Sequence, residues 1–523
     1  MVNITKAVLQ KEDCFFVILL DFLLQFNSGG GMLMEQILEK INGAVWGLPT
    51  VLLIIGVGLL ISFKTGFAQI RLFPLAVKDF VSKLRKPENG DGTSAYQALC
   101  TALAATVGTG NIAGVAGAIC LGGPGSIFWM WVCGLVGMAT KYAEAVLAVR
   151  YRLKNASGEY IGGPMYMIRQ GLRSRYRYLA YIYCFFGVVA AFGVGNATQV
   201  NAVIGGINGA IIVLGGQQSR MVDIGIAVAL CIVVGFVLFG GAKRIGRMAE
   251  SVVPFAAVFY VLLCLGVLLV RIEQIPVVFS QIMEGAFSPR SVTGGVVGSA
   301  FVALRIGASR GVFTNEAGMG TASIAHAAAD VDHPCRQGLM GIMEVFIDTI
   351  LICTLTAFVI LCSGVTIPYS LDIGVSLTVD AFSSVYGMWI CVPLAVCLCA
   401  FALATIFGWG LYGIRCAQFL FGDKVWKPFS ALQVATVMLG ALLGTGTIWL
   451  LADSVNALMA IPNLMALFLL MPELMRLTNE FKSTQGRNSA LGGTNEDIHQ
   501  RKPLRAFSYA KVPSNGGKGR AGR

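Results

Sequence analysis

The sequence has few charged residues and almost no histidine. Only 13% of its 523 residues are Asp, Glu, Lys or Arg, and the histidines are His326, His333 and His499. The zinc-protease motif HExxH is absent, and these histidines leave no evident general base for a serine or cysteine nucleophile. The 14 cysteines form no paired CxxC motif, and most lie in apolar stretches, as small packing residues do. These absences argue against an intramembrane enzyme and against a transition-metal site.

Long apolar runs dominate the chain, and 56% of its residues are hydrophobic. Runs of about 18 to 25 apolar residues recur, and a helix of that length crosses the hydrocarbon layer while satisfying its own backbone hydrogen bonds. The pattern predicts an all-α polytopic membrane protein with about eleven transmembrane helices. The predicted spans are 46–63, 97–121, 127–149, 179–204, 224–240, 252–270, 292–329, 338–361, 387–411, 432–451 and 455–474.

The net charge of +12 lies mainly in short connections and in the C-terminal tail. Alternate connections contain most of the 39 Lys and Arg residues, which favours cytoplasmic loops over a nucleic-acid surface. The count groups Arg305, Arg310 and Arg336 on the cytoplasmic side. It predicts an N-terminus outside and a C-terminus in the cytoplasm. The location that we expect is the plasma membrane, the inner membrane of a bacterium.

The two ends of the chain differ from the apolar middle. The run Cys14 to Phe26 is too short for a confident span, so this region is interpreted either as a weak signal-like segment or as a misplaced start before Met32 or Met34. The tail from Thr478 is polar and basic and is predicted to be disordered. The predicted divisions are 1–35 (extension), 36–94 (extra first helix and basic loop), 95–290 and 291–477 (two five-helix units) and 478–523 (tail).

Glycines interrupt the second and seventh spans. The second contains Gly108, Gly110, Gly114 and Gly117, and the seventh contains Gly311, Gly318 and Gly320 around Asn315-Glu316. Each span is predicted to be two half-helices with unwound backbone between them, although Gly110-xxx-Gly114 also fits a helix-packing motif. Unwound backbone at membrane depth favours a binding site, and the free N-terminus of a half-helix favours a carboxylate.

The positions of the two breaks also predict which residues cap the half-helices, and they predict a repeat of five helices. Asn111 is expected to cap the outer half of the second span, and Thr314 or Asn315 is expected to start the inner half of the seventh. Because the broken spans are five apart, the second five-helix unit must lie inverted relative to the first. This arrangement is typical of alternating-access transporters.

Several motifs resemble the alanine or glycine:cation symporter family, which includes the sodium:alanine symporters. They are GTGNIAGVAGAI (108–119), GGPGSIFWMW (122–131), GMATKYAEAVLAVRY (137–151), GGPMYMI (162–168), RGVFTNEAGMG (310–320), IAHAAA (324–329), DHP (332–334) and AIPNL (460–464). The resemblance covers about residues 37–477. It implies sodium-coupled uptake of a small neutral amino acid, alanine or glycine, on a leucine-transporter-like 5+5 inverted repeat preceded by one extra helix.

The resemblance also implies site residues. Those expected around the substrate are Thr109, Gly110, Gln199, Phe313, Asn315 and Trp409. Those expected to bind the cation are Ala104, Val107, Asn111, Phe401 and Thr405. Two alternatives remain open: Gln199 as an interhelical hydrogen-bonding residue, and Trp409 as an interfacial anchor.

The chain departs from the family pattern at Ala404-Thr405, where a Ser-Thr pair is usual. One hydroxyl ligand for sodium is missing, so a proton-coupled symporter of the same fold is retained as an alternative. Other departures are Thr321, Ser323 and Gly410, which argue for altered specificity. A channel is disfavoured because no tandem filter-like loop is visible. The choice among alanine, glycine and serine stays open.

Charged residues within the spans are few. Lys141 and Glu144 stand at i, i+3 and are predicted to pair with each other. Glu344 and Asp348 stand at i, i+4, and a gate, a proton site and a hydrogen-bond anchor are equally compatible with them. Glu316 is interpreted either as a brace for the broken helix or as an ion ligand.

Overall fold

The chain folds into helices and one short hairpin. The computed structural model describes residues 40–43, 45, 47–85, 92–155, 158–288, 293, 299–371, 374–442 and 445–490. The first-half helices are α3 (Leu48–Thr65), α4 (Ala68–Arg71), α5 (Phe73–Arg85), α6 (Ala95–Thr106), η1 (Thr109–Asn111), α7 (Ala113–Gly122), α8 (Gly125–Arg150), α9 (Pro164–Gly171), η2 (Ser174–Tyr176), α10 (Tyr178–Phe192), η3 (Gly193–Ala197), α11 (Thr198–Val213), α12 (Arg220–Leu238), α13 (Gly241–Val270), η4 (Ile272–Gln274) and α14 (Ile275–Phe287). The hairpin pairs β1 (Leu153–Lys154) with β2 (Tyr160–Ile161) in antiparallel register.

The second half is also helical. Its helices are α16 (Ala300–Asn315), α17 (Ala322–His326), α18 (Pro334–Val345), η5 (Phe346–Cys353), α19 (Thr354–Cys362), α20 (Val375–Tyr386), η6 (Met388–Ile390), α21 (Cys391–Phe421), η7 (Asp423–Val425), α22 (Trp426–Leu442), α23 (Thr445–Leu469) and α24 (Met471–Ala490). Segments η3 and η5 are π-helical turns inside longer helices, so α10–α11 and α18–α19 each continue through them.

Six helical segments of the described chain are long and apolar enough to cross a membrane. They are Gly125–Arg150, Ser174–Val213, Arg220–Leu238, Gly241–Val270, Pro334–Cys362 and Met388–Phe421. Two bent pairs, α6 with η1–α7 and α23 with α24, raise the number to eight if each pair counts as one span. The seventh predicted span does not qualify because α16 ends after 16 residues. The count of eleven spans and the inverted repeat therefore stay predictions.

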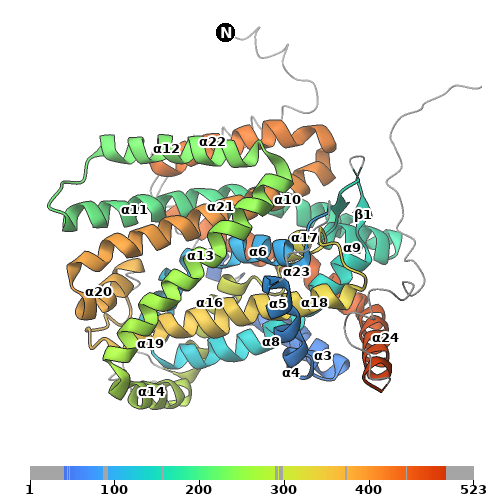
Figure 1. Ribbon diagram of the computed structural model, residues 1–523, viewed down its shortest axis with the longest axis horizontal. Helices are drawn as coiled ribbons and strands as arrows, with labels where there is room; N and C mark the ends of the chain where they lie inside the picture. Colours follow the sequence, from blue (N-terminus) through green and yellow to red (C-terminus); the bar gives the residue numbers. More distant parts are fainter. Residues whose placement is uncertain are drawn as a thin grey trace, which may run out of the picture.

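The helices run between two distinct ends of the molecule. In Figure 1, α14 and α20 lie at one end (left), and β1, α9 and α24 lie at the other (right). The second end carries the basic connection between α8 and α10. Arg305 and Arg310 lie in α16, before the break, whereas Arg336 follows it in α18. The break therefore lies between the first two arginines and the third along the chain, and the side of the membrane on which each arginine lies stays a prediction.

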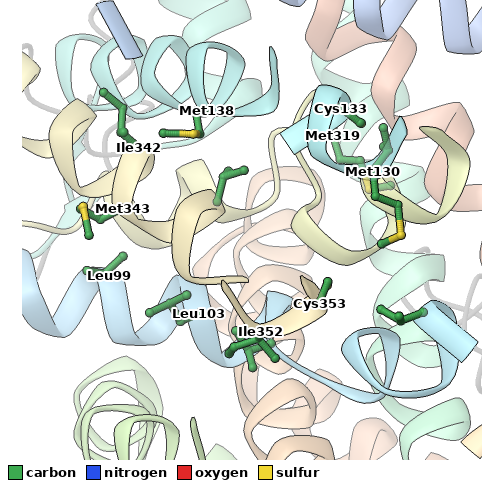
Figure 2. Packing of buried hydrophobic residues seen from close by; sticks show 14 of the residues in the cluster. Leu99, Leu103, Met130, Cys133, Met138, Met319, Ile342, Met343, Ile352 and Cys353 are labelled. Atoms are coloured by element: carbon green, nitrogen blue, oxygen red, sulfur yellow. The ribbon is translucent and has the colours of Figure 1, made fainter. Parts of the chain in front are cut away.

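The main apolar core surrounds the broken segments. Helix α8 packs against α16 and α18, and α6 packs against α13 and α21. Figure 2 shows Leu99 and Leu103 of α6, Met130 of α8 and Met343 of α18 in one buried cluster, together with Met319 from the break after α16. The unwound backbone is thus enclosed by protein, the condition under which non-helical backbone is tolerated at membrane depth.

The C-terminal segment is more ordered than its composition suggests. Helix α24 continues to Ala490 and buries Leu474, Leu477 and Phe481. The Thr478 hydroxyl lies 3.1 Å from the Tyr142 hydroxyl of α8. Residues 478–490, the start of the tail that was predicted to be disordered, are therefore helical, and the buried Phe481 packs the first part of this polar segment on the protein. The rest of the tail and the whole 1–35 extension lie outside the described residues.

Candidate functional site

The second predicted span breaks at Val107–Gly108. Helix α6 ends at Thr106, and after the break η1 and α7 continue at an angle of 60° to it. The Asn111 side chain folds back, and its Oδ1 accepts a hydrogen bond from the Gly108 N–H at 2.8 Å. Asn111 therefore stabilises the turn before α7. This hydrogen bond is the one that the N3 residue of a capping box makes, and η1 is the first turn of the outer half. The predicted cap by Asn111 is therefore found at η1, whereas α7 itself begins after Ile112 without a side-chain cap.

The seventh predicted span breaks after Asn315. Glu316, Gly318 and Gly320 all have positive φ, at 53°, 95° and 79°, so the chain leaves the helix and turns before α17. Asn315 Oδ1 accepts a hydrogen bond from the Ala317 N–H at 2.9 Å. Asn315 thus closes the outer half-helix. The prediction that Thr314 or Asn315 starts the inner half is wrong, because α17 begins after Thr321.

The two breaks meet at a cavity of about 870 Å³. Thr109 and Gly110 line it from the first break, and Phe313 lines it from the end of α16. A Cβ added to Gly110 would lie 3.4 Å from both the Phe313 ring and the Thr314 methyl group, so the two broken helices touch here. Residues of α7, α11, α16, α20 and α21 line most of the rest of the cavity.

The other predicted substrate residues lie behind this lining. Gln199 Oε1 accepts a hydrogen bond from the Thr109 hydroxyl at 3.3 Å, and Asn315 Nδ2 donates to Thr349 Oγ1 at 3.0 Å. Trp409 is fully buried and donates from Nε1 to Glu316 Oε1 at 2.9 Å. Its burial excludes the alternative of an interfacial anchor. Three of the six predicted residues thus line the cavity, and three support it.

Four of the predicted cation residues lie between α6 and α21, which pack together. Ala104 and Val107 end the first half-helix, and Thr405 donates its hydroxyl to the Phe401 carbonyl at 3.0 Å. A Cβ added to Gly108 would overlap Thr405 Oγ1, so this hydroxyl faces the break directly. Ala404 is buried beside it and supplies no oxygen from its side chain.

Asn111, the fifth predicted cation residue, belongs to a different cluster. Its Nδ2 donates to Asp348 Oδ1 at 2.7 Å, and Asp348 Oδ2 accepts from the Thr349 hydroxyl at 2.8 Å. Because Thr349 also accepts from Asn315, the Asp348 carboxylate connects both breaks. Asp348 was not among the predicted site residues, although an acidic residue inside an apolar span was the available signal.

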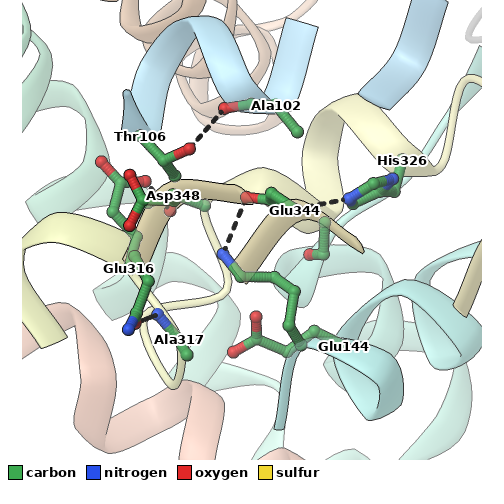
Figure 3. A network of polar contacts seen from close by, with 12 residues as sticks. Ala102, Thr106, Glu144, Glu316, Ala317, His326, Glu344 and Asp348 are labelled. Atoms are coloured by element: carbon green, nitrogen blue, oxygen red, sulfur yellow. Dashed lines mark hydrogen bonds and ion pairs between the residues drawn. The ribbon is translucent and has the colours of Figure 1, made fainter. Parts of the chain in front are cut away.

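The charged residues of the third span do not pair as predicted. Lys141 Nζ lies 3.2 Å from Glu344 Oε1 in α18, and not against Glu144. Glu344 Oε2 lies 2.7 Å from His326 Nε2, and Figure 3 shows this contact beside the neighbouring Glu144, Glu316 and Asp348. The prediction of a Lys141–Glu144 pair is therefore wrong, because α18 brings a carboxylate to Lys141 from a distant part of the chain.

Glu316 braces the broken helix. Besides accepting from Trp409, its carboxylate accepts a short hydrogen bond from the Thr321 hydroxyl, across the unwound connection. Both of its oxygens are thus bonded to protein donors. These contacts join the two sides of the break, as the interpretation of Glu316 as a brace expects.

Comparison with known proteins identifies the family. The family model described as the sodium:alanine symporter family matches residues 31–492. An uncharacterised transporter of Haemophilus influenzae is 42% identical, over 86% of this chain and 96% of its own length. The sodium/alanine symporter AgcS of Methanococcus maripaludis is 39% identical, over 87% of this chain and 99% of its own.

A solved structure supports the fold alone. MhsT, crystallised in complex with L-phenylalanine, superposes with a TM-score of 0.51 at 13% identity, over 74% of this chain and 99% of its own. With the family match, the apolar helices and the shared cavity of two broken helices, the conclusion follows: the chain belongs to the sodium:alanine symporter family, and it is a multi-pass membrane protein that works as an amino-acid:cation symporter rather than as an enzyme.

Proposed function

We propose that the chain couples inward sodium movement to the uptake of a small neutral amino acid, alanine or glycine, by alternating access. The observation that carries the proposal is the meeting of two opposite helix ends at one cavity. Thr109 and Gly110 begin η1, just before α7, where N–H groups have no partner within the helix. Phe313 and Asn315 stand at the C-terminal end of α16, where the helix dipole is negative.

These two ends suit a zwitterion. The positive end of η1–α7 favours a carboxylate, and the negative end of α16 favours an ammonium group or a cation. The charged residues lining the cavity, Arg310 and Asp380, have opposite signs, so the lining adds no net charge. Phe313 packs against Gly110 where the two breaks meet, and its ring is proposed to limit the size of the substrate side chain.

Two groups of oxygens are proposed for the cation. The first is the Asp348 carboxylate with Asn111 and Thr349, next to the substrate position. The second is the free carbonyl end of α6, at Ala104 and Val107, facing Phe401 and Thr405. Within the described residues, no group of three or more His, Cys, Asp or Glu side chains could hold a metal ion. Oxygen ligands of this kind suit a hard monovalent cation. Ala404 keeps proton coupling as the second candidate, because it supplies no hydroxyl to the second group.

We propose which side of the membrane the cavity faces from the positions of the basic connections. The basic connection between α8 and α10 and the helix α24 lie at the end opposite α20 (Figure 1). Because cationic connections stay in the cytoplasm, the cavity is proposed to open to the outside. The breaks in the second and seventh spans are proposed to correspond to each other in two inverted five-helix units.

Uptake into proteoliposomes tests the proposal. With sodium imposed outside only, we expect labelled alanine or glycine to accumulate above equilibrium, and unlabelled alanine, glycine and serine to be ranked by competition. Potassium in place of sodium should abolish accumulation. Accumulation driven by a proton gradient with potassium on both sides would reassign the coupling ion. No accumulation under either gradient would contradict the proposal.

Replacing Ala404 with serine tests the second group of oxygens. The new hydroxyl would stand next to Thr405 and add one ligand, so we expect the sodium concentration for half-maximal uptake to fall about 5-fold, or about 1 kcal/mol. Ala402→Ser is the matched control, since Ala402 is buried in the same helix but packs in a different apolar cluster. An equal effect of both variants, or none of Ala404→Ser, would place the cation elsewhere.

A further inference from the structure

A buried carboxylate from α8 holds the unwound connection between α16 and α17. Glu144 Oε1 accepts hydrogen bonds from the Gly318 N–H at 2.9 Å and the Gly320 N–H at 3.1 Å. The same oxygen accepts a third from Asn463 Nδ2 of α23 at 2.7 Å. Glu144 is fully buried, and Figure 3 shows it beside Glu316 and Glu344. One oxygen thus joins the connection to two different helices.

Asn463 completes this contact. Its Nδ2 also donates to the Gly318 carbonyl at 2.9 Å, so both polar groups of the Gly318 backbone are bonded to side chains of other helices. Gly320 lies against Asn463 as well, since a Cβ added to Gly320 would overlap Asn463 Oδ1. We call Glu144, Asn463, Gly318 and Gly320 the inner clamp.

The inner clamp supplies the hydrogen-bond acceptors that the backbone of a regular helix would otherwise supply. In a continuous helix the N–H groups of Gly318 and Gly320 would bond to carbonyls four residues earlier, but the break removes these partners. Positive φ at both glycines shows that the connection follows a path that other residues rarely adopt. Its shape therefore depends on external hydrogen bonds, and losing their acceptor would leave two buried N–H groups unsatisfied.

In the part of the chain that the structure describes, Glu144 acts as a hydrogen-bond acceptor and not as a member of an ion pair. Lys141, one turn earlier in α8, is 3.2 Å from Glu344, and none of the ion pairs found in the described residues includes Glu144. Its second oxygen, Oε2, has no hydrogen-bond partner in the same part of the chain. The three bonds to Oε1 need an acceptor and not a negative charge, so an uncharged amide of the same shape can replace the carboxylate.

We propose that Glu144 is a positioning residue for transport, which fixes the connection between the halves of the seventh span and keeps the inner half closed against α8. This inference rests on the proposed function. The connection begins right after Phe313 and Asn315, where the two breaks meet, and α17 packs against α6 and α8. Opening toward the cytoplasm requires α17 to leave these helices, and the clamp opposes that movement while the cavity is open at the other end.

Hydrogen exchange on the full-length protein in lipid nanodiscs tests the clamp without transport. In Glu144→Ala we expect the amides of the segment 316–322 to exchange at least 10-fold faster than in the unmodified protein. In Glu144→Gln they should exchange within about 3-fold of it, because the amide oxygen still accepts. Asp79→Ala is the matched control, since it removes a buried carboxylate that bonds Arg336 away from the break. It should leave the segment unchanged.

Uptake gives the second measurement. Without the inner clamp, fewer molecules are open to the outside, and the apparent KM rises in proportion as that fraction falls. We therefore expect Glu144→Ala to raise the apparent KM for alanine about 10-fold and Glu144→Gln to raise it less than about 3-fold. Asn463→Ala should act in the same direction, and the double variant Glu144→Ala, Asn463→Ala should be no worse than the more impaired single variant. This non-additivity is the mark of one shared contact.

Two results would overturn the inference. Unchanged exchange in Glu144→Ala would show that the connection does not need the clamp. Equal impairment of Glu144→Gln and Glu144→Ala would show that the negative charge, and not hydrogen-bond acceptance, is what matters. If Glu144→Ala does not fold, Glu144→Gln and Asn463→Ala give the same comparison. Absence of uptake by the unmodified protein would contradict the proposed function but leave the exchange result valid.

Discussion

Gly110→Val is expected to reduce alanine uptake at least about 100-fold, or about 2.7 kcal/mol. A Cβ at this position already comes within 3.4 Å of the Phe313 ring and the Thr314 methyl group, so the branched carbons of valine would force the two broken helices apart. They would also occupy the space proposed for the substrate carboxylate. The measurement is initial-rate uptake by proteoliposomes that contain equal amounts of correctly folded protein.

Gly205→Val is the matched control for Gly110→Val. Gly205 lines the same cavity from α11, and a Cβ there meets nothing within 4 Å. We expect its uptake to stay within about 3-fold of the unmodified protein, because the added methyl groups enter open space. Normal uptake by Gly110→Val, or equal loss in both variants, would move the substrate away from the meeting point of the two breaks.

Asp348→Asn is expected to raise the sodium concentration for half-maximal uptake at least about 30-fold, or about 2 kcal/mol. The carboxylate is fully buried, accepts from Asn111 and Thr349, and is the negative group that joins both breaks. Asparagine keeps the size of the side chain and removes the charge. The measurement is alanine uptake as a function of sodium concentration at fixed pH.

Asp223→Asn is the control for loss of an acidic residue. Asp223 stands in the first turn of α12 and accepts from Asn208 Nδ2 at 2.7 Å, away from both breaks. It should leave sodium activation unchanged. Unchanged sodium activation in Asp348→Asn would remove this carboxylate from the cation site. Unchanged sodium activation together with loss of the pH dependence of uptake would support proton coupling through Asp348.

The glycine pattern predicted the two breaks because it acts locally. Gly318 and Gly320 adopt positive φ, and Gly108 stands where α6 stops, so the backbone departs from the helix near the expected residues. The partners of the two asparagines were predicted less well than the breaks. Asn111 and Asn315 can each bond several nearby N–H groups, and the choice among them depends on the turn that the chain takes after the break.

The supporting residues could not be predicted in the same way. Trp409 was expected near the substrate, and the structure adds a hydrogen bond from its Nε1 to Glu316. Lys141 was expected to pair with Glu144 and instead lies against Glu344. In each pair the two residues come from helices far apart in sequence. Spacing along one helix identifies neighbours on that helix only, whereas a buried charge pairs with whichever partner the packing brings within reach.

The amino-acid sequence alone determined the membrane environment, the family and the approximate positions of both helix breaks. Apolar run length, family motifs and glycine spacing are properties of short segments, so they can be read without knowing where the helices lie. Only the tertiary structure decided that Thr109, Gly110 and Phe313 share one cavity, that Asp348 joins both breaks, and that Glu144 holds the connection after α16. These contacts depend on how separate helices pack, because buried polar groups must find their partners across the fold.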